Sequence, residues 1–463
     1  RKGPAMKIVI CGAGLVGTSI AEHLANENND VTVIDQNEAL VRKISESQDV
    51  RGVVGLASLP NILERAGIAD ADMLIAVTFA DEVNMVACQI AHSLFDVPLK
   101  IARIRQQEYL SPIWADLFSR ENMPIDNIIS PEIEVARAIN RRLSVPGALD
   151  VVPMADNRAV VVGVRCDEDC PIIGTPLKQL TELFPDLLMT ILAIIRDGVG
   201  VVPSSHEMLN VGDEVYFVCG VDYLQRSMAA FGHEETEARR IVVAGAGNIG
   251  LKLAQEIETA HPGVSTRMIE RDPERARVVA GALPKSVILN GDILDVDILE
   301  EADITTAETF IAVSNDDEVN FISCLLAKRY GVKRTIALIN KMTYAPLIRS
   351  LGIDVAVNPR VITVSSILQH VRRGRVRNLH SVQEDFGEVL EVEVLETSSL
   401  AGKTVKESKL PPGVLLGVRL RGEEIVVVRG NTDFIAGDRL VLFATYEAVK
   451  KVEKLFAVRF DFF

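Results

Sequence analysis

The chain has 463 residues, of which 48% are hydrophobic, and its formal net charge is −15. This length corresponds to three or four domains with ample apolar material for their cores. The negative charge disfavours binding to nucleic acid or to anionic lipid headgroups. The longest apolar runs, such as 187–195, fall well short of the ~18 residues that a membrane-spanning helix needs. We therefore expect no direct membrane insertion, and the mean hydropathy of +0.21 indicates large subunit interfaces.

Residues 1–5 read as an expression scar ahead of a native start at Met6, and no signal peptide is visible. The cysteines are scattered, and we expect buried thiols in a reducing cytosol rather than disulfides. Only Cys166 and Cys170 are close in sequence. Without a second pair or a nearby histidine they do not make a zinc motif, so no metal site is predicted.

One stretch occurs twice: residues 8–17 read I-V-I-C-G-A-G-L-V-G, and residues 241–250 read I-V-V-A-G-A-G-N-I-G. In each copy an apolar, β-branched run ends in G-x-G-x-x-G and continues into a helical pattern. An acidic residue follows about 20 residues later, Asp35 in the first copy and Glu270 in the second. This context is the dinucleotide-binding fingerprint of a Rossmann-type unit.

The fingerprint predicts which groups face a nucleotide. Its glycines allow a tight turn, a close backbone approach to a pyrophosphate and close packing of helix on strand. The helix N-terminus offers unpaired N–H groups to the phosphates. The carboxylate at the end of the second strand accepts hydrogen bonds from ribose hydroxyls and repels a 2′-phosphate. It therefore favours NAD over NADP, but it would also suit ADP or ATP. A Rossmann unit with an empty or vestigial site is the alternative.

The repeat extends well beyond the glycines. Residues 81–88 match residues 317–324, and the offset between the copies changes only from 233 to 236 between the glycines and these segments. Such a small drift indicates a tandem duplication. The alternation of strands and helices predicts a parallel sheet with helices on both faces in each copy, with the ligand crevice at the carboxyl ends of the strands.

The crevice of the first copy has further candidates. Thr78 and Phe79 follow the fourth predicted strand, across from the glycine turn. The fifth predicted strand, 99–105, carries Arg103 and Arg105 on one face at its end, where they can form charge-assisted bonds with phosphate oxygens. An ordinary pair of surface arginines is the alternative.

The second copy has Leu338 and Asn340 where the first has these arginines. Both positive charges are lost, so we predict unequal sites, of which the first binds phosphates more tightly. Arg271, beside Glu270, could partly compensate.

Helices predicted over 132–143 and about 361–371 leave the two Rossmann units. Each either exchanges with a partner subunit or packs on its own sheet. A smaller module then follows each unit, at 150–235 and 380–458, with several strand-like segments and a Gly-Asp pair before the last one. At about 80 residues, these α+β modules are small for the substrate domain of a dehydrogenase.

The chain carries no H-E-x-x-H, G-x-S-x-G or G-x-x-x-x-G-K-[ST] motif and no evident catalytic acid pair. The basic run at 372–377 reads as a solvated linker or as a phosphate or partner contact. A nucleotide site without evident chemistry indicates a sensor rather than an enzyme. The alternatives are an NAD-dependent oxidoreductase of a small substrate and a scaffold with vestigial sites.

Several stretches together resemble the TrkA family, the cytoplasmic nucleotide-binding subunits of bacterial Trk potassium uptake systems. They are M-K-I-V-I-C-G-A-G at 6–14, A-D-M-L-I-A-V-T at 71–78, N-M-V-A-C-Q at 84–89, R-I-R at 103–105, P-G-A-L at 146–149 and L-P-P-G at 410–413. The resemblance covers nearly the whole chain, and the motifs are specific only when taken together.

The resemblance implies tandem RCK (KTN) domains: Rossmann-like units at 6–145 and 238–375, each followed by a small α+β unit, at 146–235 and 376–463. It implies regulation by NAD(H) and by ATP or ADP, and a homo-oligomer, dimer or tetramer, that forms a ring. The partner would be a Trk-type membrane potassium transporter subunit, which holds the ring at the inner face of the membrane.

The implied cofactor-binding residues follow from matching positions. Those of the first site are Gly12, Ala13, Gly14, Leu15, Val16, Gly17, Asp35, Thr78, Phe79, Arg103 and Arg105. Those of the second are Gly245, Ala246, Gly247, Asn248, Ile249 and Glu270. Many RCK domains carry an acid directly after the glycine of the third strand. Leu56 stands there in the first copy, which departs from the family's pattern, whereas Asp292 keeps the acid in the second.

Overall fold

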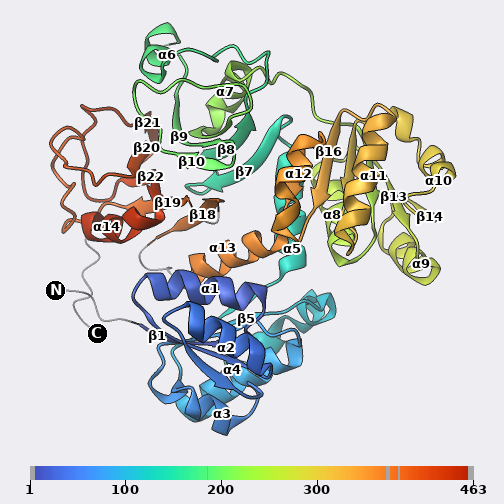
Figure 1. Ribbon diagram of the computed structural model, residues 1–463, viewed down its shortest axis with the longest axis vertical. Helices are drawn as coiled ribbons and strands as arrows, with labels where there is room; N and C mark the ends of the chain where they lie inside the picture. Colours follow the sequence, from blue (N-terminus) through green and yellow to red (C-terminus); the bar gives the residue numbers. More distant parts are fainter. Residues whose placement is uncertain (1–5, 185, 372–375, 384–385, 457–463) are drawn as a thin grey trace. The chain divides into compact units, whose positions relative to one another are not determined.

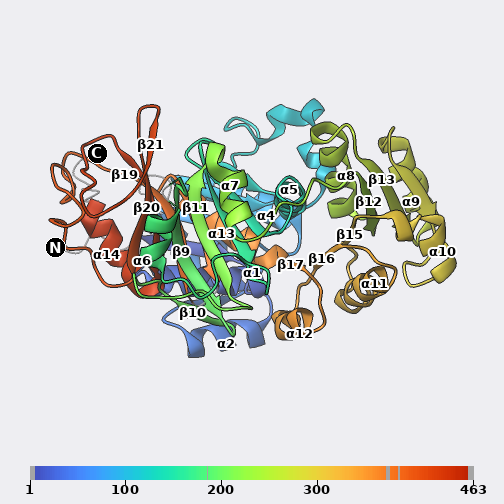
Figure 2. The ribbon, with the colours of Figure 1, turned by 90° about the horizontal axis from the view of Figure 1, so that it is seen from above.

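The computed structural model describes residues 6–184, 186–371, 376–383 and 386–456 (Figures 1 and 2). Residues 1–5, read above as a scar, and residues 372–375 of the basic run lie outside this part. Within it the chain forms two parallel sheets that alternate with two antiparallel sheets. The predicted fold class, a duplicated Rossmann-like unit followed each time by a small α+β unit, is confirmed.

The first parallel sheet has the strand order β3-β2-β1-β4-β5-β6. Its strands are β1 (Lys7–Cys11), β2 (Asp30–Asp35), β3 (Arg51–Val54), β4 (Met73–Ala76), β5 (Leu99–Arg103) and β6 (Asn127–Ile129). Its helices are α1 (Leu15–Asn26), α2 (Glu38–Ser47), α3 (Pro60–Arg65) and α4 (Asp81–Phe95), with 3-10 turns η1 (Ile68–Asp70), η2 (Gln107–Leu110) and η3 (Pro112–Phe118). β4 is buried along its whole length, as expected for a central parallel strand covered on both faces.

The second parallel sheet repeats this order as β14-β13-β12-β15-β16-β17. Its strands are β12 (Arg240–Ala244), β13 (Ser265–Glu270), β14 (Val287–Asn290), β15 (Thr309–Ala312), β16 (Arg334–Leu338) and β17 (Val355–Val357). Its helices are α8 (Asn248–Ala260), α9 (Pro273–Ala282), α10 (Val296–Glu301), α11 (Asp317–Arg329) and α12 (Ala345–Ser350), with η5 (Ile304–Thr306) and η6 (Met342–Tyr344). In both sheets the strand order reverses beside the strand that ends in the glycine turn.

The helix that leaves each Rossmann unit is exchanged between the two halves of the chain. Residues 135–143 of α5 (Pro131–Leu143) belong to the same compact unit as the second parallel sheet. Residues 360–371 of α13 (Pro359–Val371) belong to the same compact unit as the first. Asn140 of α5 contacts His261 at 3.1 Å, just beyond the end of α8. Within the chain, each helix thus joins the other half rather than its own sheet, and the exchange with a partner subunit stays a prediction.

The first antiparallel sheet has the order β10-β9-β11-β8-β7. It consists of β7 (Ala148–Met154), β8 (Ala159–Arg165), β9 (Met189–Arg196), β10 (Val199–Val201) and β11 (Glu214–Gly220), with α6 (Leu177–Leu183), η4 (Val221–Tyr223) and α7 (Leu224–Ala230). The second has the order β18-β19-β22-β20-β21. It consists of β18 (Asn378–Gln383), β19 (Gly387–Glu393), β20 (Val414–Arg421), β21 (Glu424–Val427) and β22 (Arg439–Thr445), with α14 (Tyr446–Phe456).

The two antiparallel sheets pack against each other through one apolar core. Leu192 and Val218 of the first sheet and Val418, Val441 and Phe443 of the second lie in the same buried cluster. Gly417 marks a close approach of the two sheets, because a Cβ at this position would lie 2.5 Å from Val218. The duplicated modules therefore form one intramolecular pair.

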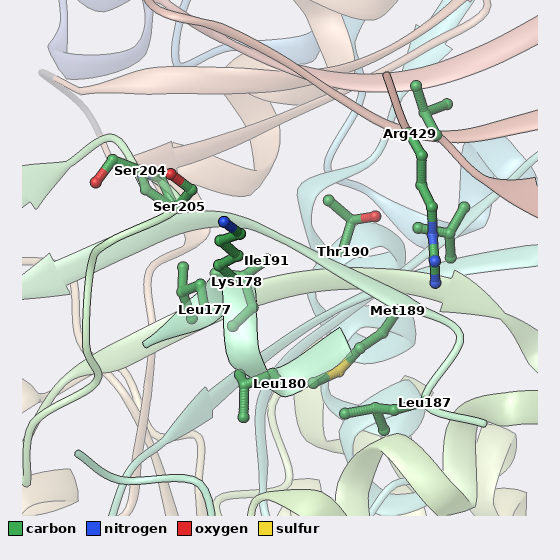
Figure 3. A pocket seen from close by; sticks show the side chains of 13 residues that line it. Leu177, Lys178, Leu180, Leu187, Met189, Thr190, Ile191, Ser204, Ser205 and Arg429 are labelled. Atoms are coloured by element: carbon green, nitrogen blue, oxygen red, sulfur yellow. The ribbon is translucent and has the colours of Figure 1, made fainter. Parts of the chain in front are cut away.

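A pocket of about 290 Å³ opens where these two modules meet (Figure 3). Most of its lining is apolar, and it also includes Lys178 from the first module and Arg429 from the second. The lining residues are Leu177, Lys178, Leu180, Leu187, Met189, Thr190, Ile191, Pro203, Ser204, Ser205, Val427, Val428 and Arg429. None of the predicted cofactor-binding residues is among them.

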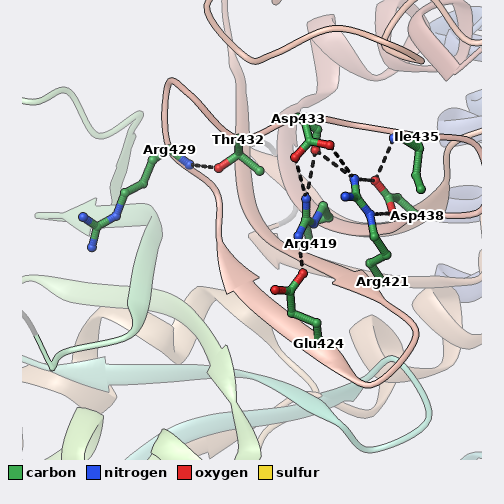
Figure 4. A network of polar contacts seen from close by, with 8 residues as sticks. All are labelled: Arg419, Arg421, Glu424, Arg429, Thr432, Asp433, Ile435 and Asp438. Atoms are coloured by element: carbon green, nitrogen blue, oxygen red, sulfur yellow. Dashed lines mark hydrogen bonds and ion pairs between the residues drawn. The ribbon is translucent and has the colours of Figure 1, made fainter.

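The Gly-Asp pair before the last strand has a structural role in both modules. The Asp438 carboxylate accepts hydrogen bonds from Nε and Nη2 of Arg421, each at 2.8 Å, and from the Ile435 amide at 2.9 Å (Figure 4). Asp213 accepts the equivalent pair from Arg196, at 2.9 and 2.8 Å. These bonds raise the pKa of the Arg421 guanidinium. A buried carboxylate thus fixes the turn that starts the central strand.

We expect Asp438→Asn to lower the free energy that protects β20 and β22 from local opening by about 3 kcal/mol, because it leaves the Arg421 charge without its buried partner. Asp433→Asn is the matched control: Asp433 also bonds Arg421, at 3.0 Å, but its side chain is 57% exposed. That change should cost less than about 1 kcal/mol. Hydrogen exchange of peptides from β20 and β22 measures both variants, and equal losses would contradict the assigned role of Asp438.

Candidate nucleotide sites at the two glycine loops

The first glycine loop is shaped by two close backbone approaches. Gly12 has φ +110°, and a Cβ there would lie 3.0 Å from the carbonyl oxygen of Val77. A Cβ on Gly17 would lie 1.9 Å from the Gly12 carbonyl oxygen, so helix α1 sits against the turn only because this residue is glycine. Gly14 differs, since nothing lies within 4 Å of its Cβ position. The fold therefore requires the outer two glycines, and the middle one borders open space.

Asp35 holds this loop in place. Its Oδ2 accepts a hydrogen bond from the Ala13 amide at 2.7 Å, and its Oδ1 accepts one from the Asn37 amide at 2.8 Å. Each carboxylate oxygen has a second lone pair, which remains suited to a ribose hydroxyl. These two hydrogen bonds thus hold the Asp35 carboxylate, the predicted ribose acceptor, at the edge of the glycine turn.

Across the crevice, buried Asn84 of α4 ties the ends of β4 and β5 together. Its Oδ1 accepts from the Thr78 amide at 2.9 Å and from the Thr78 hydroxyl at 2.6 Å. Its Nδ2 donates to the carbonyl oxygens of Thr78, at 3.1 Å, and Arg103, at 2.9 Å. Asn320 makes the same bonds to Ser314 and Leu338. No role for Asn84 or Asn320 was predicted from the sequence. The available signal was an asparagine repeated on a buried helix face.

The structure brings Arg103 and Arg105 next to the residues that follow β4, but β5 ends at Arg103, so Arg105 lies beyond the strand predicted over 99–105. The Arg103 Nη2 donates to the Thr78 carbonyl oxygen at 2.9 Å. The Arg105 guanidinium lies 5.4 Å from the ring centroid of Phe79, whose side chain is 83% exposed, and its Nε donates to Glu132 at 3.2 Å. Phe79 therefore presents an open aromatic face at the rim of the crevice.

Two guanidinium groups lie close together in this crevice, within reach of the carboxylates of Glu132 and Asp81. Burial, together with the charge of Arg105, lowers the pKa of Arg103. Its Nε is buried and has no hydrogen-bond partner among the described residues. A bound anion would relieve the repulsion between the two guanidinium groups, so the residues present fit a phosphate group.

The second glycine loop repeats the backbone geometry of the first. Gly245 has φ +103°, a Cβ on Gly250 would lie 2.0 Å from the Gly245 carbonyl oxygen, and Gly247 again borders open space. Glu270 replaces Asp35: its Oε2 accepts from the Ala246 amide at 2.9 Å, and its Oε1 accepts from the amide of residue 272 at 2.9 Å. The two loops are equally well formed.

The second loop also holds an arginine that the sequence analysis missed. Arg275 of α9 donates through Nε to the Ala246 carbonyl oxygen at 2.8 Å and through Nη2 to the Asn248 side chain at 3.2 Å. Its counterpart in α2 is Leu40, because both residues bond through their amides to the capping side chain of their helix. The sequence indicated Arg271 as a partly compensating charge, whereas the guanidinium that contacts the loop belongs to Arg275, in the first turn of α9.

The acid expected after the third strand is present only in the second copy. Asp292 caps its own turn by accepting from the Leu294 amide at 2.9 Å. The glycine before it serves packing in both copies: a Cβ would lie 2.6 Å from Ile62 at Gly55 and 2.4 Å from Ile298 at Gly291.

The described residues hold no group of three or more histidine, cysteine, aspartate or glutamate side chains that could bind a metal ion. All six cysteines are buried and none is paired. In the part of the chain that the structure covers, no helix has both the length and the apolar character required to cross a bilayer.

Comparison with known proteins matches the TrkA-N domain model to residues 8–131 and 241–359, and the TrkA-C domain model to residues 161–232 and 389–457. The chain is 50% identical over 458 residues to the Trk system potassium uptake protein TrkA of Azorhizobium caulinodans, covering 99% of this chain and 100% of that protein. It is 38% identical to the protein of the same name from Haemophilus influenzae, over 97% and 98% of the two chains.

Two solved structures share the fold at 18% sequence identity. The GsuK RCK domain superimposes with a TM-score of 0.60, covering 99% of this chain and 96% of that one. The GsuK channel bound to NAD superimposes with a TM-score of 0.59, covering 99% and 80%.

We expect Gly14→Ala and Gly17→Ala to separate binding from folding. Gly14 has φ −71°, which alanine adopts, so Gly14→Ala should keep the fold but place a methyl group where a phosphate would approach, weakening nucleotide binding at least ~10-fold. Gly17→Ala should destabilise the domain, because its methyl group would collide with the Gly12 carbonyl. Thermal unfolding and calorimetric titration with ADP distinguish the two. Equal stability loss in both variants would contradict this assignment.

Proposed function

This chain belongs to the TrkA family, and from that premise we propose that it is the nucleotide-sensing regulatory subunit of a potassium uptake system. In this proposal it binds NAD(H) and ATP or ADP at its glycine loops and gates a membrane potassium transporter by conformational change. The observation that carries the proposal is the geometry of the loops: in each half, a carboxylate bonded to the turn stands beside a glycine that borders open space.

The predicted site residues include phosphate-binding, ribose-binding and base-contacting groups in this proposal. The amides at the N-termini of α1 and α8 face the phosphates, and Asp35 and Glu270 accept the ribose hydroxyls. Arg103 and Arg105 pair with phosphate oxygens in the first site, and Phe79 offers its exposed ring to a base or nicotinamide. The neighbouring GsuK channel bound to NAD supports the choice of NAD, since it shares this fold.

The proposed partner is a Trk-type membrane potassium transporter subunit, beneath which several copies of this chain assemble into a ring at the inner face of the membrane. The relatives of this chain are named for the Trk system, which supports a potassium transporter as the partner. We place the proposed domain limits at 6–145, 146–235, 238–375 and 376–463, with α5 and α13 exchanged between the two Rossmann-like units.

The competing function is an NAD-dependent oxidoreductase of a small substrate. Hydride transfer to a carbonyl needs a proton donor near the nicotinamide. Of the polar side chains around the first crevice, the Thr78 hydroxyl and the Asn84 amide are bonded to each other and to backbone. This arrangement supports a regulator in preference to an enzyme.

Titration of the purified full-length chain with NADH, NAD, ADP and ATP tests the proposal. We expect saturable NADH binding, measured by its fluorescence, competition by the adenine nucleotides, and constant NADH absorbance over time. Steady NADH consumption in the presence of a carbonyl compound would contradict a regulatory role. Absence of binding by all four nucleotides would refute the proposed sensor.

We expect Asp35→Ala to weaken NADH binding about tenfold or more, because it removes charged acceptors for ribose hydroxyls, each worth roughly 1.5–3 kcal/mol. Asp72→Ala is the matched control: the Asp72 carboxylate also caps a backbone amide of this domain, Lys7 N at 2.8 Å, but at the opposite end of β1. Calorimetry on both variants measures the difference. Unchanged affinity in Asp35→Ala would refute the assignment of the first site.

A further inference from the structure

The two glycine loops match in backbone geometry but differ in one pair of side chains. Helices α2 and α9 both start just beyond the acid at the end of the second strand, with Asn37 and Asp272 as N-caps. The residue three positions after the cap lies beside the loop in the second copy: it is Arg275 there, and Leu40 in the first. The residue that opens the helix after the glycine loop also differs. In α1 it is Leu15, which is 68% exposed, and in α8 it is Asn248, whose side chain accepts a hydrogen bond from Arg275.

The first crevice carries its positive charge on the opposite side. Arg103 and Arg105 project from the end of β5 onto Thr78 and Phe79, across from the turn that Asp35 holds. In Rossmann-type units, the acid after the second strand faces the adenosine ribose, and the strands beyond the switch point face the rest of the ligand. The first site thus offers its charge to a distal phosphate or to the second half of a dinucleotide.

The equivalent side of the second crevice carries no comparable charge among the described residues. Leu338 is buried, and the Asn340 side chain donates to Asp317 at 3.0 Å. Lys341 follows, but its Nζ pairs with Glu318 at 3.0 Å and lies 5.4 Å from the ring centroid of Tyr344. The arginine charge therefore lies at the end of the fifth strand in the first copy, as Arg103 and Arg105, and beside the glycine loop in the second, as Arg275.

We propose that Arg275 is the specificity-determining residue of the second site, and that it makes this site recognise the adenosine ribose and first phosphates, so that a third phosphate or a second nucleotide half adds no affinity. This inference rests on the proposed function, because it assumes that both loops bind nucleotides. Arg275 uses two of its five N–H groups to bond the loop, at Ala246 and Asn248. The remaining donors suit the oxygens of a phosphate that approaches the N-terminus of α8.

The bonds to the loop also explain why an arginine is effective here. They hold the guanidinium in one orientation before a ligand arrives, so less side-chain entropy is lost on binding. Glu270 keeps the ribose acceptor beside it, as Asp35 does in the first site. A third phosphate or a second nucleotide half finds no arginine at the end of the fifth strand, so it adds no affinity.

The test uses the full-length chain with the first site disabled by Asp35→Ala, titrated calorimetrically with AMP, ADP and ATP. We expect one ADP site per chain, with AMP and ATP within about threefold of ADP. Adding Arg275→Leu, which installs the residue of the first copy, should weaken ADP at least tenfold. Arg277→Leu is the control: it removes the same charge from α9, but this side chain is 75% exposed and pairs with Glu274.

A converse variant keeps the test decisive if Arg275→Leu destabilises the domain. With the second site disabled by Glu270→Ala, Leu40→Arg should raise the AMP affinity of the first site about tenfold. Loss of ADP binding in Arg277→Leu equal to that in Arg275→Leu would overturn the inference, as would an unchanged affinity in Arg275→Leu or a second site that binds nothing. If the unmodified chain binds no nucleotide, the proposed function itself fails, which is a distinct result.

Discussion

The hydrogen bond between a strand-end carboxylate and the glycine turn is the constraint on which both halves of this protein depend. Asp35 accepts a hydrogen bond from the Ala13 amide at 2.7 Å, and Glu270 accepts one from the Ala246 amide at 2.9 Å. The turn has to bend sharply into a helix while leaving its middle glycine uncovered, and the carboxylate fixes it in that shape. The same acid that shapes the loop is the one that a ribose would contact.

The two copies share the residues that shape the backbone of the glycine loops and differ in the charged side chains that a ligand would contact. The close approach of Gly17 to Gly12 recurs at Gly250 and Gly245, because any larger side chain would push the helix off the sheet. The Asn84 bonds recur at Asn320 for the same reason, since they join two strand ends. The charged side chains differ between the copies, because Leu338 and Asn340 stand in place of Arg103 and Arg105, and Arg275 stands in place of Leu40.

The exchange of α5 and α13 makes the two halves of the chain mutually dependent. The first turn of α5 belongs to the first unit, where Glu132 pairs with Arg105, and its later turns belong to the second, where Asn140 contacts His261. Neither Rossmann-like unit is completed by its own segment of sequence. In the proposed regulator, one continuous helix therefore links the first nucleotide site to the second unit.

The sequence by itself determined the fold class, because the alternation of β-branched runs with helical patterns and the duplicated glycines reflect local backbone requirements. It also placed Arg103 and Arg105 at the end of the fifth strand, but the strand ends at Arg103, so the prediction of a shared face from a strand over 99–105 does not extend to Arg105. Only the tertiary structure decided which sheet α5 and α13 pack on, because a helix has the same apolar periodicity whichever sheet covers it. It also decided that Arg275 lies on the second loop, because the contact joins the first turn of α9 to a turn 29 residues earlier in the chain, a pairing that no local pattern specifies.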